Sequence, residues 1–87
     1  MQIKEKFEKA QLIYLQLDEQ IEKFDITRLR EVNADFFMPI TDKRGLGGII
    51  IADDGTYLLC GSRYSVSYYI DEFKKGERTN LEMNKLQ

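Results

Sequence analysis

Histidine is absent from this sequence of 87 residues, and cysteine and proline occur once each. Without histidine, the commonest general acid or base of enzymes is missing. The single cysteine, Cys60, excludes an intramolecular disulfide, and its apolar neighbours indicate a buried, unreactive thiol. The sequence also lacks the cysteine and histidine clusters that bind zinc and the alternating acidic residues of a calcium loop. It therefore predicts no enzyme, no metal site and no cofactor.

Long apolar runs are missing as well. No stretch approaches the roughly 18 consecutive apolar residues of a membrane span, and the opening MQIKEKFEKA lacks the apolar core of a signal peptide. Thirteen basic residues against fifteen acidic ones give a net charge of −2. This is the wrong sign for a protein that binds nucleic acid by neutralising phosphates. We therefore expect a cytoplasmic protein that binds neither membranes nor nucleic acids.

The residues that are present describe a small folded protein. Hydrophobic residues make up 43% of the chain and charged residues 32%, which is typical of globular domains. A chain of this length can bury one modest core, so residues 1–87 are predicted to form a single domain.

Apolar residues near the N-terminus recur with a spacing that alternates between four and three. This stripe predicts an amphipathic helix from Ile3 to Phe24. At 1.5 Å per residue such a helix would be roughly 33 Å long, about the diameter of a compact domain of this size. Such a helix should span the whole domain or overhang it, and in the second case its first turns could meet a second chain. The stripe consists of Ile3, Phe7, Ala10, Tyr14, Leu17, Ile21 and Phe24.

The stretch GIIIADDGTYLLC, Gly48 to Cys60, predicts a β-hairpin. Two runs of strand-forming residues flank Asp54 and Gly55, a pair that suits a two-residue type I′ turn. In that register Ile51 faces Leu58. Because both strands are apolar at consecutive positions, both faces of the hairpin should be covered by other elements.

The remaining segments complete the predicted fold. The stretch DFFMPI indicates a strand at Phe36 to Ile40, and Pro39 should place it at a sheet edge or end it. DITRLREVN, Asp25 to Asn33, fits a short helix or a strand equally well. SVSYYIDEFKKG has helical spacing, with Ser65 as the cap and Gly76 at the end.

We thus expect an α+β fold in which a long N-terminal helix and a shorter C-terminal helix pack on a small antiparallel sheet. The sheet should have two or three strands and a hairpin at Asp54 and Gly55. In the tail ERTNLEMNKLQ, Thr79 and Glu82 have the spacing of a capping box, which is compatible with a short terminal helix.

TDKRGLGGII, Thr41 to Ile50, carries glycines beside Lys43 and Arg44 and so invites comparison with a phosphate-binding loop. Such loops lead into a helix, whose free amides reach the phosphate. Here Gly47 and Gly48 lead into a strand instead. We interpret the segment as a polar turn followed by a close approach of backbones.

Two sets of candidate functional residues remain. The loop from Gly61 to Ser65 joins a strand to a helix, so its amides and side chains could bind a small anion or nucleotide. The alternative is that Ser65 only caps the helix. The overhanging helix and two tyrosines indicate a contact surface instead. The ligand set is Ser62, Arg63 and Ser65, and the interface set is Ile3, Phe7, Ala10, Tyr64 and Tyr68.

From the residues alone, the preferred function is a non-catalytic protein-interaction or regulatory module that self-associates, with a homodimer expected. The alternative is a domain that binds a small anion or nucleotide through the loop from Gly61 to Ser65.

Overall fold

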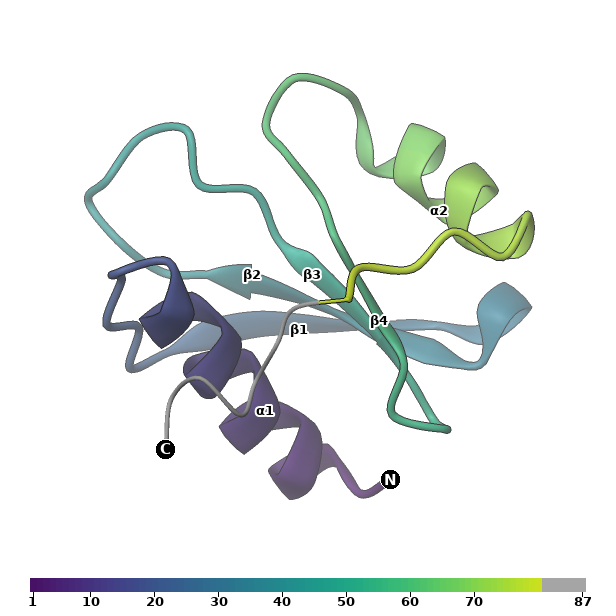
Figure 1. Cartoon of the computed structure of the whole chain (residues 1–87), viewed down its shortest axis with the longest axis horizontal. Helices are drawn as coiled ribbons and strands as arrows, with labels where there is room; N and C mark the ends of the chain where they lie inside the picture. Colours follow the sequence, from purple (N-terminus) through teal and green to yellow (C-terminus); the bar gives the residue numbers. More distant parts are fainter. Residues whose placement is uncertain (81–87) are drawn as a thin grey trace.

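The structure is a computed structural model that describes residues 1–80. A four-stranded antiparallel sheet lies between two helices (Figure 1). The strands are ordered β1-β2-β3-β4, so each strand pairs with the next one along the chain. The α+β prediction is confirmed, although the sheet is larger than the two or three strands expected. The elements are α1 (Ile3–Gln16), β1 (Phe24–Leu29), the 3-10 helix η1 (Arg30–Val32), β2 (Ala34–Pro39), β3 (Ile49–Ala52), β4 (Tyr57–Leu59) and α2 (Val66–Lys74).

The helices cover opposite faces of the sheet, as Figure 1 shows. Because side chains alternate along a strand, neighbouring residues of β3 enter different cores. Ile49 and Ile51 pack under α1 with Ala10 and Ile13, whereas Ile50 packs on the other face with Phe73 of α2. The prediction that both faces of the hairpin need cover is confirmed.

The predicted extent of the first helix was wrong. α1 ends at Gln16, because Asp18 has a φ of 60° and turns the chain into the left-handed region. Its 14 residues span about 21 Å, so it does not overhang a domain whose longest dimension is 31 Å. Ile21 and Phe24 still pack in the core between α1 and the sheet. Ile21 does so from the extended segment after α1, and Phe24 does so from β1.

The ambiguous segment, Asp25 to Asn33, contains both a strand and a helical turn. β1 runs to Leu29 and the 3-10 helix η1 follows. Asn33 then adopts a φ of 50°, which reverses the direction of the chain. β2 follows, with Ala34 paired directly opposite Leu29.

The hairpin exists, but its predicted register was wrong by one residue. Ile51 pairs with Tyr57, and the Ala52 N–H donates to the Thr56 carbonyl at 2.8 Å, which leaves a three-residue loop from Asp53 to Gly55. A type I′ turn needs positive φ at both central residues, whereas here Gly55 alone has it, at 91°. Asp54 instead accepts hydrogen bonds from the backbone N–H and the hydroxyl of Thr56. The result is the three-residue arrangement in which glycine supplies the left-handed position.

The second helix matches its prediction. The Ser65 hydroxyl oxygen caps α2 by accepting the Tyr68 N–H at 3.3 Å, and Gly76 follows the helix with a φ of 96°. Pro39 ends β2 as expected, but β2 is an interior strand and not an edge. The predicted terminal helix falls on residues 81–87 and lies outside the described residues. Neither described helix has the length and apolar character needed to cross a bilayer.

Candidate functional site

A hollow of about 290 Å³ lies beneath the loop that joins β4 to α2. β2 contributes Phe36 and Met38 to its lining, and the loop and α2 contribute Tyr64, Val66 and Tyr69. Most of its remaining lining is glycine, leucine or the buried Cys60, with Ser62 and Ser65 as its serines. The hollow therefore offers a mainly apolar surface with hydroxyl groups from tyrosine and serine.

Glycine is required where the chain enters this hollow. A Cβ atom at Gly47 would lie 1.7 Å from the carbonyl oxygen of Cys60, and one at Gly48 would lie 2.5 Å from the Phe36 ring. The sequence prediction of a close backbone approach here is confirmed. No side chain fits at either position without displacing the backbone or the ring.

Three tyrosines form a cluster beside the hollow. The ring centroids of Tyr64 and Tyr68 are 4.4 Å apart, and those of Tyr68 and Tyr69 are 5.1 Å apart. Tyr64 is 52% exposed and Tyr68 is 41% exposed, and neighbouring Val66 is exposed as well. We call Tyr64, Val66, Tyr68 and Tyr69 the tyrosine surface. Amphipathic aromatic side chains of this kind are enriched at protein contacts.

The structure places the predicted ligand residues in two settings. Ser65 is engaged as the cap of α2, and Ser62 lies beside it in the lining of the hollow. Arg63 is exposed, does not line the hollow, and makes no hydrogen bond or ion pair within residues 1–80. The Arg63 side chain is therefore separate from the lining that holds Ser62 and Ser65.

The predicted interface residues of α1 separate into three environments. Ile3 is 49% exposed, whereas Ala10 is fully buried in the core and therefore lies beneath any contact surface. Phe7 is half-buried and packs edge-on against Phe24 of β1, with ring centroids 5.4 Å apart. Sequence periodicity placed all three on one stripe but could not tell which part of the stripe the sheet covers.

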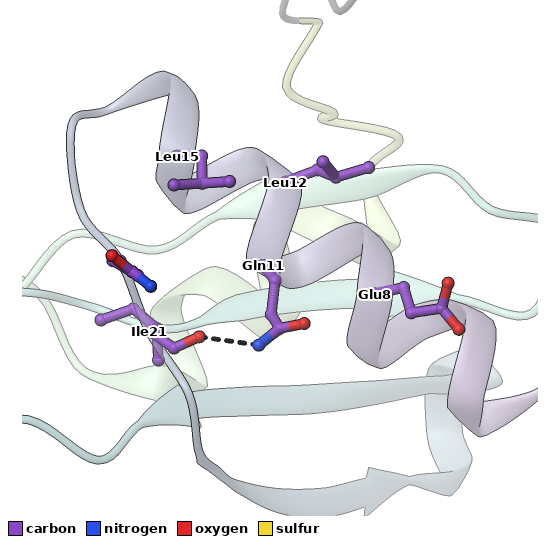
Figure 2. A pocket seen from close by; sticks show the side chains of 6 residues that line it. Glu8, Gln11, Leu12, Leu15 and Ile21 are labelled. Carbon is purple, nitrogen blue, oxygen red and sulfur yellow. Dashed lines mark hydrogen bonds between the residues drawn. The ribbon is translucent and has the colours of Figure 1, made fainter.

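A second hollow, of about 340 Å³, lies between α1 and the segment before β1 (Figure 2). The Gln11 side chain points toward the backbone of Ile21 and donates a hydrogen bond to the Ile21 carbonyl at 2.9 Å. Leu12 and Leu15 border it and are exposed. Glu8 is its one charged lining residue, so the second hollow brings no pair of reactive groups together.

A cluster of four charges, which we did not predict, joins α1 to the sheet. The Lys6 ammonium lies 2.7 Å from Asp35 and 2.7 Å from Asp53. Arg28 contacts Asp53 through two nitrogens, at 2.8 and 2.9 Å, and lies 3.3 Å from Asp35. The sequence held one signal for this cluster: Lys6 precedes Ala10 by one helical turn and so shares its buried face.

Two members of the cluster, Asp53 and Arg28, have shifted pKa values. Hydrogen bonds from Arg28 and then Lys6 hold the pKa of Asp53 well below its usual range, and the bond to Asp53 raises the pKa of Arg28. Asp53 and Arg28 therefore stay ionised at neutral pH and do not exchange protons with a substrate. The arrangement is therefore suited to fixing α1 against the sheet.

Burial raises the pKa of the Cys60 thiol to about 12. The thiol therefore remains protonated at neutral pH and is a poor nucleophile. In the part of the chain that the structure describes, no group of three or more histidine, cysteine or acidic side chains is placed to hold a metal ion.

Comparison of the chain with protein-family models, with curated proteins and with solved structures finds no match in any of the three. Function must therefore be inferred from the geometry described above.

Proposed function

We propose that this domain is a non-catalytic protein-interaction module whose tyrosine surface contacts a partner protein. The observation that carries the proposal is the cluster of Tyr64, Tyr68 and Tyr69, in mutual ring contact at the border of an apolar hollow. Tyrosine contributes strongly to binding energy at protein contacts, especially beside a pocket that a partner side chain can fill.

The lining of the hollow favours an apolar side chain over an anion. An apolar group that enters it would leave water and contact Phe36 and Met38. The tyrosine rings already pack on one another, so binding would immobilise them at little further entropic cost. An anion would find the Ser65 oxygen committed to the helix cap and Arg63 outside the hollow.

The ionisable groups support a non-catalytic role. The Asp53 carboxylate is held ionised by its ion pairs, and hydrogen bonds from Thr56 lower the pKa of Asp54. The Cys60 thiol is protonated and buried. None of these groups combines access, a matched pKa and a partner for proton transfer, which is the combination that acid–base or nucleophilic catalysis uses.

Site-specific photo-crosslinking tests the proposal. A photoreactive phenylalanine analogue is placed at position 64 or 68 in the full chain, and at exposed position Lys4 of α1 as the control. Irradiation in an extract of the source cells should give an adduct of defined mass from positions 64 and 68 but not from position 4. Excess parent chain should suppress that adduct, and a Tyr64→Ser/Tyr68→Ser chain should not. Equal labelling from all three positions would contradict the proposal.

A further inference from the structure

The two edge strands of the sheet, β1 and β4, differ in how far other residues hydrogen-bond to their outward backbone groups. At the β4 edge, the Thr79 N–H donates to the Tyr57 carbonyl at 2.7 Å, and the Leu59 N–H donates to the Thr79 hydroxyl at 2.8 Å. The segment after α2 therefore satisfies backbone groups of β4 that would otherwise face solvent. Sealing an edge in this way prevents another strand from pairing with it.

The β1 edge has no such cover in the described residues. The Ile40 N–H donates to the Lys23 carbonyl at 3.0 Å. Because hydrogen-bonded positions alternate along an antiparallel pair, the backbone groups of Phe24, Ile26 and Arg28 must face away from β2. These outward groups make no hydrogen bond to any part of residues 1–80. They form a ready row of donors and acceptors.

On the α1 side of the sheet, the side chains of β1 do little to protect this edge. β1, FDITRL, contains no proline or lysine, which are common devices against strand pairing. Ile26 lies at its centre and is 42% exposed. The cation of Arg28 is already paired with Asp53 and Asp35 inside the chain. The strand therefore presents an apolar centre beside a neutralised arginine.

We propose that β1 pairs antiparallel with β1 of a second copy, about a two-fold axis through Ile26, and joins the two sheets into one. In this register, each residue whose backbone groups face away from β2 lies opposite such a residue of the second copy. Phe24 lies opposite Arg28 of the partner subunit, and Ile26 lies opposite its own counterpart. On the α2 side of the sheet, Asp25 lies opposite Thr27 of the partner subunit.

The strand fits a copy of itself because its side chains are self-complementary. The Asp25 carboxylate can accept a hydrogen bond from the Thr27 hydroxyl across the seam, and no like charges lie directly opposite each other. A shift of two residues in one direction sets Asp25 against Asp25. A shift in the other direction sets Asp25 against Leu29, and either shift leaves outward backbone groups unpaired.

Side chains of α1 also lie beside the seam, the line along which the two β1 strands pair. A two-fold axis perpendicular to the joined sheet places both copies of α1 on one face. Phe7 packs on Phe24 of β1, and Ile3 lies one helical turn before Phe7 on the same stripe. Both residues therefore flank the seam, which gives the self-association expected from the sequence a defined geometry. This surface is separate from the tyrosine surface, so each proposal can fail without the other.

Light scattering coupled to size-exclusion chromatography tests the pairing on the full chain, up to about 1 mM, a concentration at which weak dimers assemble. The parent should elute with the mass of a dimer. Ile26→Lys sets two ammonium groups opposite each other and should weaken the dimer at least ten-fold. Thr27→Lys is the matched control: it adds the same charge one residue away, opposite Asp25, and should leave the dimer intact. Because both positions are exposed, both variants should fold.

Charge exchange tests the register. Thr27→Asp sets a carboxylate against Asp25 and should weaken the dimer, and adding Asp25→Lys should restore it. Hydrogen exchange at the Ile26 amide should also slow as the parent concentration rises. A parent that stays monomeric at the highest concentration, an Ile26→Lys chain with the parent's dimer mass, or an unrestored double variant would overturn the proposal.

Discussion

The Lys6 ammonium lies 2.7 Å from the Asp35 carboxylate, and both residues are buried. The contact joins α1 to β2, an interior strand of the sheet. Removing two charges from water offsets much of their attraction, so such a pair adds little net stability compared with an apolar pair. It does fix which part of α1 lies over the sheet, because any sliding of the helix would leave a buried charge without its partner.

Truncation of one partner should therefore be costly. Lys6→Ala leaves Asp35 buried, with Arg28 at 3.3 Å as its remaining ion-pair partner. The free energy of unfolding in urea should fall by about 3 to 5 kcal/mol, as for other broken buried pairs. Lys4→Ala, which removes an exposed lysine of the same helix, should change it by less than about 0.5 kcal/mol. Equal losses in the two variants would contradict this role of Lys6.

Asp53 should make the stability of the domain sensitive to acid. Arg28 and Lys6 hold its pKa in the folded state below the value of about 3.9 expected in the unfolded chain. Its contribution is therefore complete above the unfolded pKa and is lost as the pH falls through the folded pKa.

Asp53→Asn provides the measurement. The parent should be more stable than this variant by a constant margin between about pH 7 and pH 5. The margin should shrink below about pH 4, because the carboxylate is then protonated in the unfolded parent while it stays ionised in the folded parent. Urea titrations of both chains across this range give the margin directly. A margin that stays constant down to about pH 2 would show that the ion pairs do not lower this pKa.

Gly55 should tolerate little substitution, although the loop it ends differs from the one predicted. Its φ of 91° lies in the region that β-branched residues avoid. Gly55→Val should lower the free energy of unfolding by on the order of 1 kcal/mol or more. Gly55→Asn should cost less, because asparagine tolerates left-handed conformations. Two variants as stable as the parent in urea would exclude this strained position.

Local sequence patterns predicted the parts of the fold that local physics determines. The cap at Ser65, the left-handed Gly76 that follows α2 and the close approach at Gly47 each follow from a requirement of one or two residues. The end of α1 did not follow, because the apolar spacing continues through Ile21 while Asp18 leaves the helix. A periodic pattern records which side chains are buried, and an extended segment that returns under the helix buries them equally well.

The candidate sites were less predictable, because they depend on contacts between distant residues. Tyr64 and Tyr68 were predicted as contact residues from the sequence, but the hollow beside them needs Phe36 and Met38 from β2. The pairing of Lys6 with Asp35 spans 29 positions in the sequence and has no local signature beyond a lysine on an apolar helix face. Whether β1 lies at an edge of the sheet depends on the strand order, which cannot be known until all four strands are placed.

Small-molecule binding can distinguish an apolar site in the hollow from an anion site in the loop beside it. If the hollow accepts apolar groups, 4-methylphenol, which resembles a tyrosine side chain, should shift the amide resonances of Gly47 and Gly61 in NMR spectra. Val66→Asp places a charge in the lining and should weaken this binding by roughly ten-fold, because the charge loses hydration when the probe enters. Arg63→Ala should leave both the binding and the melting temperature unchanged, because Arg63 lies outside the lining.

Phosphate, sulfate and nucleotides test the alternative by calorimetric titration. A guanidinium that binds an anion contributes roughly 1.5 to 3 kcal/mol, so under the alternative Arg63→Ala should weaken binding by roughly ten- to a hundred-fold. We expect instead no heat of binding from the parent, because Arg63 lies outside the hollow and the Ser65 oxygen is committed to the cap. Saturable anion binding that disappears in Arg63→Ala, together with silence from 4-methylphenol, would reverse this preference and assign the loop to anions.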